Sequence, residues 1–236
     1  VEALTEPQII SPSNTTSFCQ NDPPVPLTAN VPDAVFLGNG VTGSVEEGFY
    51  FDPSLAPLGE STITCLVRSE FGCEKKSEIT FTVKFTPLTR FTVESACLSS
   101  GGGLIQFENL TAGKVEVETW NWNFGDVNSG ASNFSEEIDP EHFYPSAGDW
   151  TITLEASTYE GCSSTYQLDT TFSSQPYAAF TWKSNCYSEG EGVKLISNAT
   201  GGQTGLEELV WTFMDDEGTV FDELQASLDD DTTVYQ

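Results

Sequence analysis

The cysteines of this chain recur at a near-constant interval, and that interval defines a repeat. The steps from Cys19 to Cys97 and from Cys97 to Cys186 are similar in length (97 − 19 = 78 and 186 − 97 = 89). Phe-Gly-Cys at Cys73 and Glu-Gly-Cys at Cys162 repeat the longer step (162 − 73 = 89). Self-similarity at a fixed period is typical of repeat architectures. We therefore expect units of about 80–90 residues, each with one cysteine near its start and one, after a glycine, near its end.

Alternating apolar and polar residues predict that these units are built from strands. The clearest alternating runs are Ile79–Phe85, Val115–Phe124 and Trp150–Ala156. A period of two over such a length is typical of half-buried strands. Turn-rich stretches such as Ser99–Gly103 separate the runs, and no stretch has a convincing helical period. Regular short strands with frequent turns predict β-sandwiches.

Prolines interrupt the strand pattern twice, at Thr86–Pro87 and at Ser174–Pro176. We place the domain boundaries there, because proline is poorly tolerated within a sheet. The predicted fold class is all-β, with tandem sandwiches at 1–86, 87–175 and 176–236. The third domain is expected to lack its C-terminal strands, and the chain is expected to be a piece of a longer secreted protein.

Charge and histidine content exclude several functions. The chain has 36 Asp and Glu against 8 Lys and Arg, a net charge of −28. An unaided nucleic-acid binder needs basic residues to neutralise phosphates, so no nucleic-acid partner is expected. Docking on an anionic membrane is disfavoured equally, and no apolar run could span a bilayer. Because His142 is the one histidine, a catalytic triad or histidine metal cluster would rest on it alone. We predict that the chain is not an enzyme.

The middle unit resembles the PKD domain. Three blocks carry the resemblance: Trp-Asn-Phe-Gly-Asp at Trp122–Asp126, Asp-Pro-Glu-His-Phe-Tyr at Asp139–Tyr144, and Gly-Asp-Trp-Thr-Ile-Thr-Leu at Gly148–Leu154. They occur in the order and spacing of that family. A looser version follows in the third unit, with Trp-Thr-Phe-Met-Asp-Asp at Trp211–Asp216 and Thr-Thr-Val-Tyr at Thr232–Tyr235.

The first unit looks like an Ig-like repeat instead. Its blocks are Phe-Cys-Gln-Asn-Asp-Pro-Pro from Phe18, Phe-Leu-Gly-Asn-Gly from Phe36, and Phe-Gly-Cys from Phe71. Ig-like and PKD units with this cysteine pattern resemble those of giant gliding-motility adhesins of the SprB type in Bacteroidota. That resemblance implies an extracellular, cell-surface location, export by the type IX system, and a non-catalytic role as stalk or adhesive module. It implies as partners neighbouring repeats, cell-surface motility or secretion machinery, and surface polysaccharide.

Two other functions stay open. Such modules also accompany catalytic domains in secreted hydrolases, so the chain could be an accessory region of one. A carbohydrate-binding module would need a row of exposed aromatic side chains on one face. For Trp122 and Trp211 we favour burial in the core over sugar stacking, because Ig-type sandwiches bury a central tryptophan. Trp120, Trp122 and Phe124 share one strand face by parity. Trp182 is freer to be exposed.

No cofactor is expected. The resemblance implies that His142 is a packing residue held by a hydrogen bond. Adjacent carboxylates on a strand point to opposite faces, so pairs such as Glu136–Glu137 indicate a solvated surface. Clustered acidic loops suit Ca²⁺, which prefers six to eight oxygen ligands. Asp126–Gly130 begins like a calcium loop but lacks the later acidic ligands, so only weak Ca²⁺ binding is expected.

The repeat also predicts disulfides, in agreement with an oxidising compartment. We predict the pairs Cys19–Cys73 and Cys97–Cys162, each closing its own domain. Cys65 shares the parity of the apolar residues around it and is predicted to be a buried free thiol. Cys186 is predicted to be unpaired within this chain, its partner falling about 18 residues past Tyr235 by comparison with the middle unit.

Overall fold

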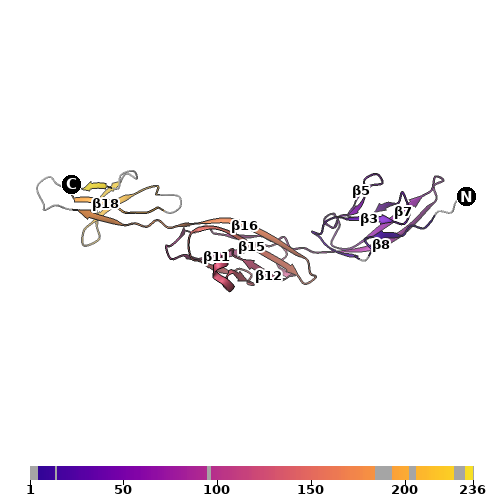
Figure 1. The fold of residues 1–236 in the computed structure, drawn as a ribbon, viewed down its shortest axis with the longest axis horizontal. Helices are drawn as coiled ribbons and strands as arrows, with labels where there is room; N and C mark the ends of the chain where they lie inside the picture. Colours follow the sequence, from indigo (N-terminus) through magenta and orange to yellow (C-terminus); the bar gives the residue numbers. More distant parts are fainter. Residues whose placement is uncertain are drawn as a thin grey trace.

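The structure is a computed structural model, and it describes residues 5–13, 15–94, 97–183, 193–201, 206–225 and 232–235. Strands account for 57% of the chain and helix for 6%, which confirms the all-β prediction. Three two-sheet units follow one another in a row, with the first and third at opposite ends (Figure 1). Among the described residues, no helix is long and apolar enough to cross a membrane.

The first unit comprises strands β1–β8. Its strands are β1 (Ile9–Ser11), β2 (Ser17–Cys19), β3 (Val25–Ala29), β4 (Val35–Leu37), β5 (Val41–Ser44), β6 (Gly48–Phe51), β7 (Gly59–Arg68) and β8 (Glu74–Lys84), with the 3₁₀ turn η1 (Pro53–Leu55). They form two sheets, ordered β1-β3-β6-β5 and β2-β8-β7-β4. Three phenylalanine rings, Phe18, Phe51 and Phe81, pack together between the sheets. The alternation predicted for Ile79–Phe85 corresponds to β8, which buries alternate residues toward this core.

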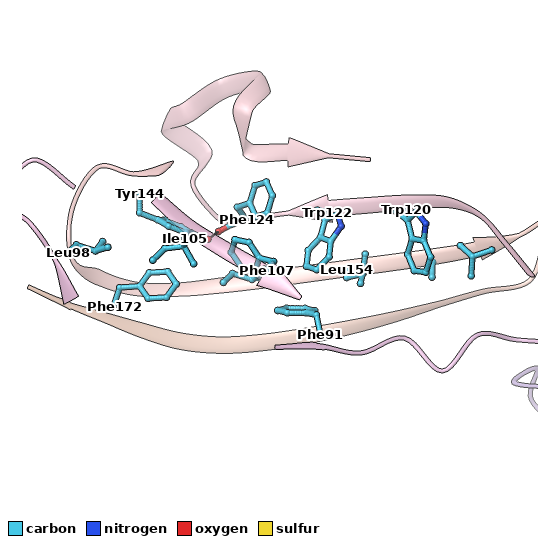
Figure 2. Close-up of a cluster of buried hydrophobic side chains, with 13 residues drawn as sticks. Phe91, Leu98, Ile105, Phe107, Trp120, Trp122, Phe124, Tyr144, Leu154 and Phe172 are labelled. Atoms are coloured by element: carbon cyan, nitrogen blue, oxygen red, sulfur yellow. Dashed lines mark hydrogen bonds between the residues drawn. The ribbon is translucent and has the colours of Figure 1, made fainter. Parts of the chain in front are cut away.

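The second unit comprises strands β9–β16. Its elements are β9 (Phe91–Val93), β10 (Cys97–Leu98), β11 (Gly103–Asn109), η2 (Lys114–Glu116), β12 (Val117–Asn123), η3 (Val127–Asn133), β13 (Phe134–Ser135), β14 (Glu141–Tyr144), β15 (Gly148–Thr158) and β16 (Ser163–Ser174). The sheets are ordered β10-β16-β15-β12-β13 and β14-β11-β9. Trp120 and Trp122 lie side by side between them (Figure 2). Both tryptophans and Phe124 are buried, as their shared parity predicts.

The third unit comprises strands β17–β21. Its strands are β17 (Phe180–Lys183), β18 (Val193–Ser197), β19 (Val210–Met214), β20 (Val220–Gln225) and β21 (Thr232–Tyr235). The sheet β17-β18-β21 repeats the arrangement of β9-β11-β14 in the second unit. The sequence blocks at Trp211 and Thr232 therefore lie on strands β19 and β21, equivalent to β12 and β14. In the described part of the chain, no sheet combines strands from two units.

Both of the first two units place a strand near their start parallel to their last strand. In the first unit, β2 pairs with the end of β8, with Cys19 opposite Lys84. In the second unit, β10 pairs with the end of β16, with Cys97 opposite Ser173. The last two strands of each unit form a long antiparallel hairpin whose turn lies at the opposite end of that pairing. Each unit therefore has a hairpin end and a parallel-pair end.

Candidate functional site: the cross-linked joint between two units

A disulfide bond joins the first unit to the second. It links Cys19 to Cys162, whose Cα atoms are 5.5 Å apart although 143 residues separate them in sequence. Cys19 ends β2 at the parallel-pair end of the first unit. Cys162 lies in the turn between β15 and β16, at the hairpin end of the second unit. The bond therefore crosslinks the facing ends of two consecutive sandwiches.

Local packing fixes Cys19 at this end. The preceding residue, Phe18, is buried in the core of the first unit and anchors β2. The Cys19 backbone N–H donates to the Asp22 carboxylate (2.7 Å), and the Asp22 N–H donates back to the Cys19 carbonyl (3.0 Å). This reciprocal turn holds the Cys19 backbone at the point where β2 ends.

A tight turn presents Cys162. The Thr158 N–H donates to the Cys162 carbonyl (2.8 Å), and the Cys162 N–H donates to the Thr158 hydroxyl (3.1 Å). Gly161 has a φ of 85°, in the left-handed region that favours glycine, which accounts for the Gly-Cys dipeptide. Cys162 itself is fully buried.

Polar contacts surround the disulfide. The Asn21 side-chain amide donates to the Ser163 carbonyl (2.9 Å), and the Lys84 ammonium donates to the Glu160 carbonyl (3.1 Å). Both contacts run from the first unit to the hairpin of the second. The Thr86 hydroxyl donates to the Asn21 side-chain oxygen (2.9 Å), which ties the linker between β8 and β9 to the same contact.

The linker itself lies along the second unit. The Ser164 hydroxyl donates to the Pro87 carbonyl (2.6 Å), and the Thr89 hydroxyl donates to the Ser164 carbonyl (3.1 Å). Thr89 is buried. The linker is therefore hydrogen-bonded over its length, which limits the freedom of the two units to reorient.

The predicted pairs Cys19–Cys73 and Cys97–Cys162 are not those of the structure, in which Cys73 and Cys97 are free and exposed. Strand length gives the reason. Cys19 lies opposite Lys84, and Cys73 immediately precedes β8, so the length of that strand separates them. Eleven residues of strand span about 36 Å, whereas a disulfide needs Cα atoms within about 7 Å. In the second unit, the length of β16 separates Cys97 from Cys162 in the same way.

The prediction for Cys65 is confirmed. This residue is on β7 in the core of the first unit, is fully buried and carries a free thiol. Burial raises the pKa of the thiol, since the apolar surroundings disfavour the thiolate. Cys186, predicted to be unpaired, lies outside the described residues.

The aromatic residues proposed as sugar platforms are mostly structural. Trp122 is 1% exposed, and its indole N–H donates to the Glu137 carbonyl (2.8 Å). Trp211 is partly buried and packs edge-on against Phe180 (5.3 Å between centroids). Trp182 is 63% exposed, as its sequence position allowed.

His142 is part of the core of the second unit. Its ring stacks on Phe124 (4.5 Å) and meets Tyr144 edge-on (4.7 Å). Its Nε2 is 3.4 Å from the Asp126 carboxylate, and both side chains are 3% exposed. The Tyr144 hydroxyl donates to the Phe124 carbonyl (2.9 Å). The packing role predicted for His142 is confirmed, but its buried Nε2 has no hydrogen-bond partner, so the predicted hydrogen bond is not found at that atom.

The acidic loop proposed for calcium does not present its first ligand. The Asp126 carboxylate is turned inward toward His142 rather than into the loop. Among the described residues, no group of three or more His, Cys, Asp or Glu side chains is arranged to hold a metal ion.

The fold and the joint define a class of protein: a tandem array of β-sandwich units in which a disulfide joins two consecutive units. Within it, residues 99–172 match the model of the PKD domain family. PKD domains are generally non-catalytic modules. No curated protein matched the chain in a sequence comparison.

Solved structures resemble the chain at low identity. The PKD1 domain of the Vibrio cholerae metalloprotease PrtV is 23% identical, with a TM-score of 0.31, over 37% of this chain and 96% of that domain. Immunoglobulin domains 1–5 of Sidekick-1 are 10% identical, with a TM-score of 0.33, over 94% of this chain and 50% of that one. A tetra-tandem repeat from the extending region of a large adhesion protein is 14% identical, with a TM-score of 0.24, over 90% of this chain and 60% of that one.

Proposed function

We propose that this chain is a non-catalytic stalk segment of a large secreted cell-surface adhesin that acts in surface attachment and gliding motility. The observation that carries the proposal is the Cys19–Cys162 disulfide, which locks one unit to the next. Such a crosslink serves a segment that must keep its shape under load. A disulfide also persists best in an oxidising, extracellular place.

The strand order supports a load-bearing role. In each of the first two units, a strand near the start and the last strand are parallel neighbours. When the Cys19–Cys162 bond is reduced, a pull on the two ends of the unit would slide one strand along the other. Several ladder hydrogen bonds would then be loaded together instead of breaking one after another.

Charge supports an extended array at the cell surface. The net charge of −28 makes neighbouring copies repel one another. The partners expected for such a segment are adjacent repeats, cell-surface motility or secretion machinery, and surface polysaccharide. The segment itself is expected to be exported by the type IX system.

The test is made in the organism that carries the gene. Intact cells are labelled with antibodies against residues 1–236, and the segment is deleted in frame before attachment under flow and gliding speed are measured. We expect surface labelling in intact cells and loss of attachment or gliding after deletion. If the segment is instead found on a soluble hydrolase in the medium, and deletion alters only hydrolysis, the accessory-region alternative replaces the adhesin proposal.

A further inference from the structure

The exposed free cysteine Cys73 occupies the same kind of turn as the bonded Cys162. In the first unit, the Ser69 N–H donates to the Cys73 carbonyl (2.9 Å) and the Cys73 N–H to the Ser69 hydroxyl (3.1 Å). In the second unit, Thr158 makes the equivalent pair with Cys162 at 2.8 Å and 3.1 Å. The glycine before the cysteine has a φ of 81° in one turn and 85° in the other. The two hairpins therefore present their cysteines in the same way.

The other exposed free cysteine, Cys97, occupies the position of Cys19. Cys19 is opposite Lys84, and Cys97 is opposite Ser173, each in a parallel pair with the last strand of its unit. Lys84 follows the hairpin cysteine Cys73 at the same interval at which Ser173 follows Cys162 (84 − 73 = 173 − 162). Cys97 is thus placed at the parallel-pair end of the second unit, next to the end of β16, from which the chain continues to the third unit.

The second joint also repeats the first. Leu88 and Ala112 form an isolated bridge where the second unit begins, and Tyr177 and Thr200 form one where the third begins. Leu88 and Tyr177 follow the hairpin cysteine of the unit before at the same interval (88 − 73 = 177 − 162). A proline precedes each of them. The chain therefore enters the third unit with the same local structure as it enters the second.

We propose that Cys73 and Cys97 each form a disulfide of the Cys19–Cys162 type with a cysteine of a neighbouring unit. Cys97 bonds the hairpin cysteine of the unit that follows, and Cys73 bonds the first-strand cysteine of a unit that precedes. The occupant of each site is an equivalent unit of the same array, so every joint carries one disulfide. This inference rests on the proposed function in one respect, namely that further units complete the array.

Forming each bond needs an electron acceptor, for which we name a small-molecule or protein disulfide. The thiolate of one cysteine attacks that disulfide and expels one thiolate. The second cysteine then attacks the mixed disulfide and expels the other. One sulfur–sulfur bond forms and one is broken. The donor disulfide takes up two electrons, and the two protons of the cysteine thiols end on the two thiols that leave. Exposure of Cys73 and Cys97 makes both open to this exchange.

The test is peptide mapping of the full-length protein isolated from cells. Free thiols are alkylated on intact cells before lysis, and disulfide-linked peptides are identified without reduction. We expect Cys97 linked to a Gly-Cys hairpin peptide of the next unit and Cys73 linked to a first-strand peptide of the preceding one. Cys19–Cys162 is the positive control. Cys65 should be alkylated only after unfolding, since it is fully buried.

A cysteine variant distinguishes loss of the disulfide from loss of the fold. Cys97→Ser in the full-length protein should make the hairpin cysteine of the next unit reactive, while the Cys19–Cys162 peptide stays intact. Cys65→Ala is the matched control and should free no partner. Alkylated Cys73 and Cys97 in the native protein, or a bond between the two, would overturn the inference. Because the mapping detects bonds and not attachment, links without adhesion would refute the proposed function alone.

Discussion

The disulfide should make most of the first two units inextensible. Residues 20–161 lie in a covalent loop closed by Cys19 and Cys162, so a pull on the chain ends passes through the sulfur–sulfur bond instead. The closed loop spans 143 residues of sequence. A fully extended chain measures at most about 3.3–3.6 Å per residue. The closed loop therefore removes about 500 Å from the contour length that the chain can reach under force. Only the segments outside the loop can extend while the bond is intact.

Single-molecule force spectroscopy measures this length directly. The chain is pulled from its two ends with and without a reductant, and total contour length is read from the last unfolding event. We expect reduction, or Cys162→Ser, to add about 500 Å. Cys73→Ser is the matched control, because that hairpin cysteine is free, and it should leave the contour length of the oxidised chain unchanged. Equal lengths in the oxidised and reduced chains would show that the two units are not crosslinked.

Three further predictions concern the cores. Trp122→Ala should destabilise the second unit by about 3–5 kcal/mol in chemical denaturation, whereas Trp182→Ala, at an exposed site, should change little. Burial, and then the Asp126 carboxylate, raise the pKa of Tyr144. Its contribution to stability is therefore complete below the unfolded-state pKa of about 10 and is lost as the pH rises above it, so Tyr144→Phe should flatten the alkaline part of the stability–pH curve. Cys65→Ser should cost about 1–3 kcal/mol in the first unit, because it buries a hydroxyl among apolar side chains, and an unchanged denaturation midpoint would contradict that.

Much of the fold could be predicted from sequence, because strand periodicity is a local signal. The alternation of Val115–Phe124 and Trp150–Ala156 corresponds to β12 and β15, which are hydrogen-bonded neighbours. Burial of Trp122 and Cys65 followed from parity on single strands. The Asp126–Gly130 stretch was less predictable: all but its first residue lie in the 3₁₀ turn η3, and the buried Asp126 carboxylate contacts His142 on β14. Periodicity contains no information on such a contact.

The prediction of the cysteine pairs was wrong for a different reason, which is a property of repeats. A bond within a unit and a bond to the next unit give equally regular spacings, because moving the partner by one period leaves the pattern unchanged. The 143-residue interval is the within-unit interval of 54 (73 − 19) plus the period of 89 (162 − 73). Only the length of the strands in three dimensions distinguishes a bond within a unit from a bond to the next unit. The last strand of each of the first two units has 11 or 12 residues and runs the length of the sandwich, which puts the two cysteines of one unit at opposite ends. Long terminal strands in a tandem sandwich therefore favour bonds across joints, and shorter ones would permit bonds within units.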